Sequence, residues 1–112
     1  MGADSTLIFY GVRIVTTEDE SHGLQLNTDP RIRRARDHQL AHWWGRFSVD
    51  SVNDQCYLLI GSLIAQVGHE GVYQVCLRDA DFQPVVDQTK AKLSMAGFSD
   101  EPALHILFEP DY

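Results

Sequence analysis

Four stretches of the chain show the alternation of apolar and polar positions, and the β-branched and aromatic residues, that are typical of β-strands. They are residues 7–15, 56–67, 72–78 and 104–108. The second stretch is apolar on both faces, which indicates a central strand. Residues 68–71 (Gly-His-Glu-Gly) separate it from the third stretch, so the pattern predicts a four-residue turn and an antiparallel hairpin.

A helical pattern covers residues 30–44. Asp29 can cap the helix N-terminus and Pro30 suits its first position, where the missing N–H costs nothing. A period of 3.6 residues then places one apolar stripe along the helix, made of Ile32, Ala35, Leu40, Trp43 and Trp44. Arg36 falls within this stripe, and residues 43–49 could instead be partly extended.

A second helical pattern follows residues 79–83. Asp79 and Asp81 precede Pro84, which we expect in the first helical turn. The helix is expected to end at Gly97, in the left-handed position that closes a Schellman motif, with Phe98 folding back on the last turn.

The elements therefore follow the order β-α-β-β-α-β, and the chain shows no repeat and no long linker. This order predicts an α+β fold: a single-domain, two-layer sandwich of about four mostly antiparallel strands with two helices packed on the sheet. The domain is expected to span residues 1–112, with flexible ends at 1–5 and 109–112. The strand order stays open.

Composition supports one folded domain in the cytoplasm. Of 112 residues, 44% are apolar, which is enough for a core and too many for a disordered chain. The longest apolar stretch, residues 56–67, is too short to span a bilayer, and residues 1–6 lack the pattern of a secretion signal. Cys56 and Cys76 are expected to be buried free thiols, so nothing requires an oxidising compartment.

Charge is distributed unevenly. Residues 31–46 contain five of the nine basic side chains and one aspartate, giving a formal charge of +4 within a chain of net −7. The same stretch holds both tryptophans and two histidines. This basic, aromatic segment is the obvious candidate for a functional surface.

We interpret this segment as an interaction surface for a protein partner or a second copy of the chain. Arginine and tryptophan are the residues that most often anchor protein interfaces. The predicted surface consists of Arg33, Arg36, Trp43, Trp44 and Arg46. No catalytic motif accompanies it, since the nucleophile elbow, phosphate-binding loop and dinucleotide fingerprint are all missing from the sequence. The chain is expected to be non-enzymatic and to need no cofactor.

Binding of nucleic acid or another anion is the first alternative. Arg31, Arg33, Arg34 and Arg36 could contact phosphates, and the tryptophans could stack on bases. The acidic chain, with a pI of about 5.0, disfavours this reading, because nucleic-acid binders usually present a basic domain.

A metal-dependent enzyme is the second alternative. His38 and His42 are four residues apart, the spacing that brings two imidazoles to one metal from a single helical face. Gln39 stands where a zinc protease would have glutamate. A metal site needs at least a third ligand, for which Asp37, His22, His69 and Glu70 are the candidates.

Overall fold

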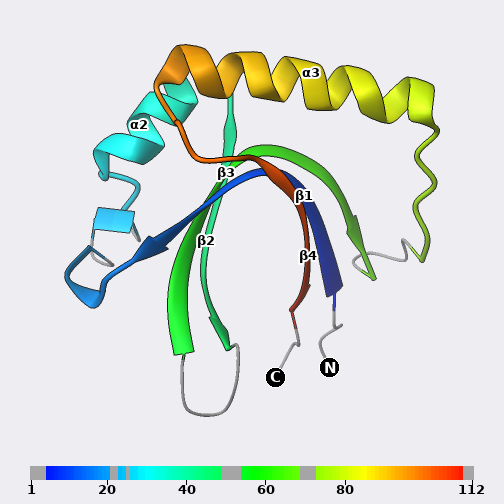
Figure 1. Cartoon of the computed structure of the whole chain (residues 1–112). Helices are drawn as coiled ribbons and strands as arrows, with labels where there is room; N and C mark the ends of the chain where they lie inside the picture. The colour runs from blue at the N-terminus through cyan, green and yellow to red at the C-terminus, as the bar shows by residue number, and fades with distance from the viewer. Residues whose placement is uncertain (1–4, 21–22, 25, 49–53, 69–72, 110–112) are drawn as a thin grey trace.

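The structure, a computed structural model, describes residues 5–20, 23–24, 26–48, 54–68 and 73–109. Within them it contains four strands, two α-helices and one short 3-10 helix (Figure 1). In chain order these are β1 (Ser5–Thr16), η1 (Glu18–Glu20), α2 (Pro30–Asp37), β2 (Ala41–Ser48), β3 (Asp54–Val67), α3 (Asp79–Ala96) and β4 (Ala103–Glu109). The predicted α+β class and the β-α-β-β-α-β order are confirmed.

All four described strands form one antiparallel sheet in the order β2-β3-β1-β4. The first β-α-β unit, β1-α2-β2, therefore encloses β3, and the second, β3-α3-β4, encloses β1. This is the split β-α-β arrangement. Both helices lie on the outer side of the sheet, which arches beneath α3 (Figure 1). The described part of the chain contains no helix that is both long and apolar enough to cross a membrane.

The arch depends on a glycine pair at the centre of the sheet. Gly11 of β1 lies directly opposite Gly61 of β3. A Cβ at either position would collide with a backbone carbonyl, that of Ile60 or that of Tyr10. The two backbones can approach this closely only because both residues lack a side chain, and β1 and β3 bend sharply near this point (Figure 1).

The curved sheet buries apolar side chains on both faces. The helix-side core joins both helices to the sheet and includes Val12, Ile32, Leu58, Ile60 and Leu93. A smaller concave core, inside the arch, consists of Leu7, Phe9 and Leu59, each at most 1% exposed. Burying one such side chain stabilises the fold by about 1.5–3 kcal/mol, so each core secures one face of β1 and β3.

The predicted helix over residues 30–44 is wrong at its C-terminal end. Its start is confirmed: the Asp29 side chain caps the helix by accepting from the Arg31 N–H at 2.9 Å. The helix ends at Asp37, however, because Gln39 takes a left-handed conformation (φ 60°) and the Leu40 N–H returns to the Ala35 carbonyl at 2.8 Å. The aromatic residues that follow form strand β2 (Ala41–Ser48). This agrees with the alternative that residues 43–49 are partly extended.

The predicted strand over residues 72–78 is also wrong. Residues 73–78 pair with no strand among the described residues, and all six are exposed. The hairpin partner of β3 is β2, which pairs with residues 54–61. Of the predicted turn over residues 68–71, all but Gly68 lie outside the described residues. The strand count nevertheless holds, because β2 takes the place of the expected strand.

Helix α3 begins earlier than predicted, at Asp79, so Pro84 lies in its second turn. Its end is confirmed: Gly97 is left-handed (φ 85°), and the Phe98 N–H bonds to the Leu93 carbonyl at 3.0 Å. The thiols are free, as expected, but only Cys56 is buried, whereas Cys76 is exposed.

Candidate functional site

The predicted interface residues belong to two different elements. Arg33 and Arg36 are exposed on α2, while Trp43 and Trp44 are consecutive residues of strand β2. Successive side chains of a strand point to opposite faces, so the two indoles cannot share the stripe that a helix would have given them. Arg46 also belongs to β2, and its side chain lies outside the described residues.

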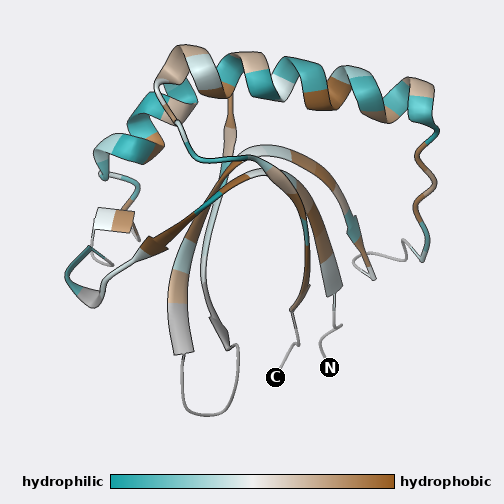
Figure 2. Ribbon diagram, viewed as in Figure 1, coloured by the Kyte–Doolittle hydropathy of each residue, from teal (hydrophilic) through white to brown (hydrophobic). Residues whose placement is uncertain are grey.

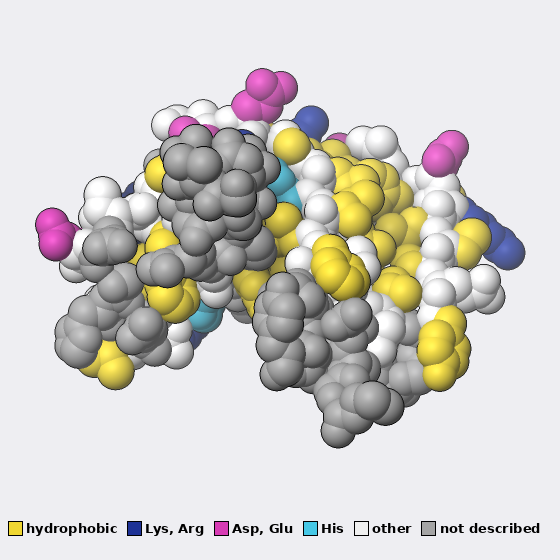
Figure 3. All heavy atoms as spheres, turned by 90° about the horizontal axis from the view of Figure 1, so that it is seen from below, with side chains coloured by type: hydrophobic (Ala, Val, Ile, Leu, Met, Phe, Trp, Pro, Cys, Tyr) yellow, Lys and Arg dark blue, Asp and Glu magenta, His cyan; other side chains and the backbone are white. Residues whose placement is uncertain are grey.

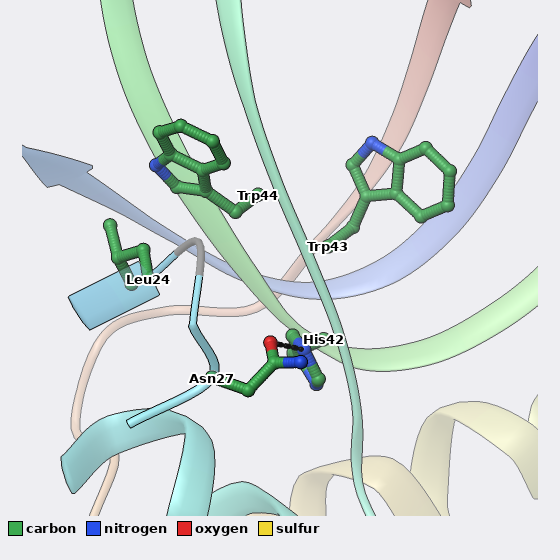
Figure 4. A pocket seen from close by; sticks show the side chains of 5 residues that line it. All are labelled: Leu24, Asn27, His42, Trp43 and Trp44. Atoms are coloured by element: carbon green, nitrogen blue, oxygen red, sulfur yellow. Dashed lines mark hydrogen bonds between the residues drawn. The ribbon is translucent and has the colours of Figure 1, made fainter. Parts of the chain in front are cut away.

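Each tryptophan packs against a different core. Trp44 lies on the helix side, opposite Leu58, and Trp43 lies on the concave side, opposite Leu59. Figure 4 shows the two indoles on opposite sides of β2. Both side chains are half-buried, and each covers part of the core that it packs against.

An open cleft lies beside β2, on the outer edge of the sheet. It has a volume of about 380 Å³ and is lined by Leu24, Asn27, His42, Trp43 and Trp44 (Figure 4). Asn27, in a left-handed conformation, places its side-chain oxygen 3.2 Å from His42 Nε2. The buried Trp44 Nε1 has no hydrogen-bond partner among the described residues. Chemically, the cleft can bind a small polar group by hydrogen bonds.

Burial lowers the pKa of His42, and the positive charge of Arg36 lowers it further. Both effects disfavour the imidazolium form, so the imidazole in the cleft is biased towards its neutral form. A neutral imidazole can donate from one nitrogen and accept at the other, which suits hydrogen bonding in the cleft.

Two of the four arginines proposed to bind anions are engaged within the chain. Arg31 donates to Asp29 at 2.9 Å and also pairs with Glu20. The pKa of Asp29 is lowered chiefly by its hydrogen bond from the Arg31 side chain. The pKa of Glu20 is lowered chiefly by the hydrogen bond from the Thr17 backbone N–H, and the charge of Arg31 lowers it further. The pairs fix η1 to the start of α2, and Arg31 is therefore occupied.

Arg34 joins the two helices. Its guanidinium lies 4.9 Å from the centre of the Phe98 ring and donates to the Ala96 carbonyl at 3.4 Å. A cation at this position stabilises the C-terminal end of α3 through the exposed carbonyl groups of its last turn. Among the described residues, Arg33 and Arg36 are the two of these four arginines that are exposed and make no such contact.

The two histidines proposed as metal ligands are separated by the end of α2. His38 caps the helix, and its Nδ1 lies 3.0 Å from the Arg34 carbonyl, whereas His42 is on β2 and contacts Asn27. The helical spacing on which this reading depended does not exist. Within the described residues, no three His, Cys, Asp or Glu side chains are grouped as a metal site would require. His22, His69 and Glu70, the more distant candidates, lie outside them.

Sequence reasoning missed an exposed apolar row on β4. The alternate residues Leu104, Ile106 and Phe108 lie on the helix side of the sheet, in register with Tyr10, Ile8 and Thr6. The helices do not extend over this part of the sheet, however, and the three side chains are 47%, 64% and 61% exposed. The sequence carries no signal for this, because alternation is the same in covered and uncovered strands.

Comparison with known proteins identifies no relative. No protein-family model, no curated protein and no solved structure matches the chain. The geometry of the described residues is therefore the basis for assigning a function.

Proposed function

We propose that this chain is a non-enzymatic protein-interaction domain that binds through strand β4. The observation that carries the proposal is the exposed row of Leu104, Ile106 and Phe108 on an edge strand. The contact surface assigned here is thus β4, in place of the arginine and tryptophan residues of α2 and β2.

An edge strand supports binding in two ways. Among the described strands β4 pairs only with β1, so the N–H and C=O groups along its other edge can hydrogen-bond to an added strand. The apolar row supplies the hydrophobic contact, and contiguous exposed apolar surface marks interaction sites in soluble proteins. Hydrophobic residues run along β4 in Figure 2. Figure 3, seen from below, shows that hydrophobic side chains are also exposed on the underside of the molecule.

Away from the cleft beside β2, several polar side chains of the described residues that could support chemistry make structural contacts instead. His105 Nε2 lies 3.0 Å from the Gly11 carbonyl, and Arg13 stacks on the Tyr57 ring at 4.8 Å. His38 and Arg31 bind a backbone carbonyl and carboxylates, respectively. These contacts support the interpretation of the chain as a binding domain. The exposed thiol of Cys76 supports a cytoplasmic location, where thiols stay reduced.

The proposal predicts that Ile106→Arg abolishes association. Ile106 is 64% exposed, so arginine is tolerated by the folded chain but places a charge in the middle of the apolar row. Met95→Arg is the matched control, since Met95 is 77% exposed on the outer face of α3. Both variants should keep the circular-dichroism spectrum and melting temperature of the wild type.

Sedimentation then measures the self-association of the wild type and of both variants. Quantitative pull-down compares the co-purifying proteins that each of them binds. Loss in Ile106→Arg and retention in Met95→Arg supports the proposal. If the β4 variant retains every association of the wild type, β4 is not the binding surface.

A further inference from the structure

Residues 73–78, here called the connecting arm, have a strand-like sequence but no strand partner among the described residues. Apolar side chains alternate along the arm: Tyr73, Val75 and Leu77 are 85%, 38% and 41% exposed. The arm leads into α3 and stands apart from the sheet at one side of the molecule (Figures 1 and 2). A chain normally hides such a segment, so its exposure calls for a partner.

Strand β4 is the matching feature. It has seven residues, the arm has six, and each carries three large, exposed apolar side chains at alternate positions. Figure 1 shows β4 well separated from the arm of the same chain. Each chain thus carries one unpaired strand-like segment and one unpaired apolar edge, and two copies related by a two-fold axis could satisfy both features at once.

We propose that two copies of this chain form a dimer in which each connecting arm adds, antiparallel, to the β4 edge of the other copy. This inference rests on the proposed function, since it names the partner of the β4 surface as a second copy. The dimer would extend each four-stranded sheet by one strand.

One antiparallel register aligns all the apolar side chains. Placing Val75 opposite Ile106 sets Tyr73 opposite Phe108 and Leu77 opposite Leu104. Directly opposed residues of antiparallel strands lie on the same face, so the three pairs form one continuous row. In the same register Arg78 lies opposite Ala103 and diagonal to Glu101, and both charged residues are exposed in the single chain. The charges at this end of the interface are therefore complementary.

The exposed area is close to what a stable dimer needs. The six apolar side chains expose roughly 600 Å² per chain, taking about 150–220 Å² for each large side chain in full contact with water. A specific interface typically covers about 800 Å² on each partner. Backbone pairing of the added strand and the neighbouring polar residues can supply the remainder.

The first experiment measures the oligomeric state by sedimentation velocity over a range of protein concentrations. The wild type is expected to dimerise, and Val75→Arg and Ile106→Arg should each weaken the dimer by about tenfold or more, since each buries an unpaired charge. Met95→Arg should dimerise as the wild type does. Because all three positions are exposed, the variants should remain folded.

The second experiment tests the register by cross-linking. His105 lies opposite Cys76 of the other copy in this register, at a backbone separation that a disulfide can bridge. With oxidised glutathione as the two-electron oxidant, His105→Cys should form a covalent dimer through Cys76. The double variant His105→Cys, Cys76→Ser should not form it, because the buried Cys56 is inaccessible.

The outcomes separate this inference from the proposed function. A wild type that stays monomeric overturns the dimer, while loss of a different partner in Ile106→Arg would still support β4 as a binding surface. A dimer broken by Ile106→Arg but not by Val75→Arg overturns the role of the arm and indicates pairing of the two β4 strands. A dimer that Ile106→Arg leaves intact overturns both proposals.

Discussion

His42 is the side chain through which mild acid should act on the folded chain. Burial, and then the charge of Arg36, lowers its pKa below the ordinary value of 6.5. The unfolded chain therefore takes up a proton at a higher pH than the folded chain does, and protonation favours unfolding. The stability contributed by the neutral imidazole is complete above about pH 6.5 and is lost as the pH falls towards the lowered pKa.

His42→Gln should flatten this dependence, because glutamine can still contact Asn27 but cannot be protonated. Urea unfolding at about pH 7.5 and about pH 5.5 measures the effect, which solvent screening should keep below about 1 kcal/mol at this half-buried site. Equal losses of unfolding free energy in the variant and the wild type would assign the dependence to another group.

The two tryptophans show why the sequence pattern grouped residues that the fold places on different elements. Trp43 and Trp44 share a stripe on a helix but face opposite ways on a strand, so one change of element divides the predicted surface. The change itself depends on Gln39, which is left-handed although it is neither glycine nor asparagine. No residue type marked this turn, whereas Gly97 marked the end of α3 correctly.

At the scale of the elements, the bend of β1 and β3 should depend on Gly61. A Cβ there would collide with the Tyr10 carbonyl, so Gly61→Ala must separate the two central strands. Such overpacking should cost at least about 1–3 kcal/mol of unfolding free energy, measured by chemical denaturation.

Gly23→Ala is the matched control, because the nearest atom to its added Cβ is Thr28 Oγ1, at an ordinary 3.5 Å. It should change stability by no more than about 0.5 kcal/mol. If the two substitutions lower the free energy of unfolding equally, the close contact between Gly61 and the Tyr10 carbonyl is not what the bend depends on.

Elements defined by local chemistry were predicted well, and those defined by distant partners were not. Asp29 and Gly97 set helix ends through contacts within a few residues, and the apolar faces of β1 and β3 were clear in the sequence. The connecting arm has the same alternation as a paired strand, and only the sheet decides which segments pair. The apolar side chains of the arm and of β4 stay exposed in the single chain. In the proposed dimer, a second chain would cover them.

At the scale of the whole molecule, the basic segment and the acidic remainder have different roles. Arg31 and Arg34 attach α2 to η1 and α3, so part of the local positive charge is used inside the chain. The chain as a whole carries −7, and two copies in a dimer would repel one another. The apolar row on β4 must overcome this repulsion for the proposed dimer to form.

Salt should therefore strengthen the proposed dimer. Raising the ionic strength from about 0.01 M to about 0.15 M shortens the screening length from about 30 Å to about 8 Å, which weakens repulsion between the two acidic chains. The apolar contacts are unaffected, and the exposed pair of Arg78 and Glu101 is worth too little to reverse the trend. Sedimentation equilibrium at the two ionic strengths should give a lower dissociation constant at the higher one. A dimer that dissociates as salt is added would instead be held by ion pairs, and Arg33 and Arg36, the exposed arginines of α2, would then be the side chains to substitute.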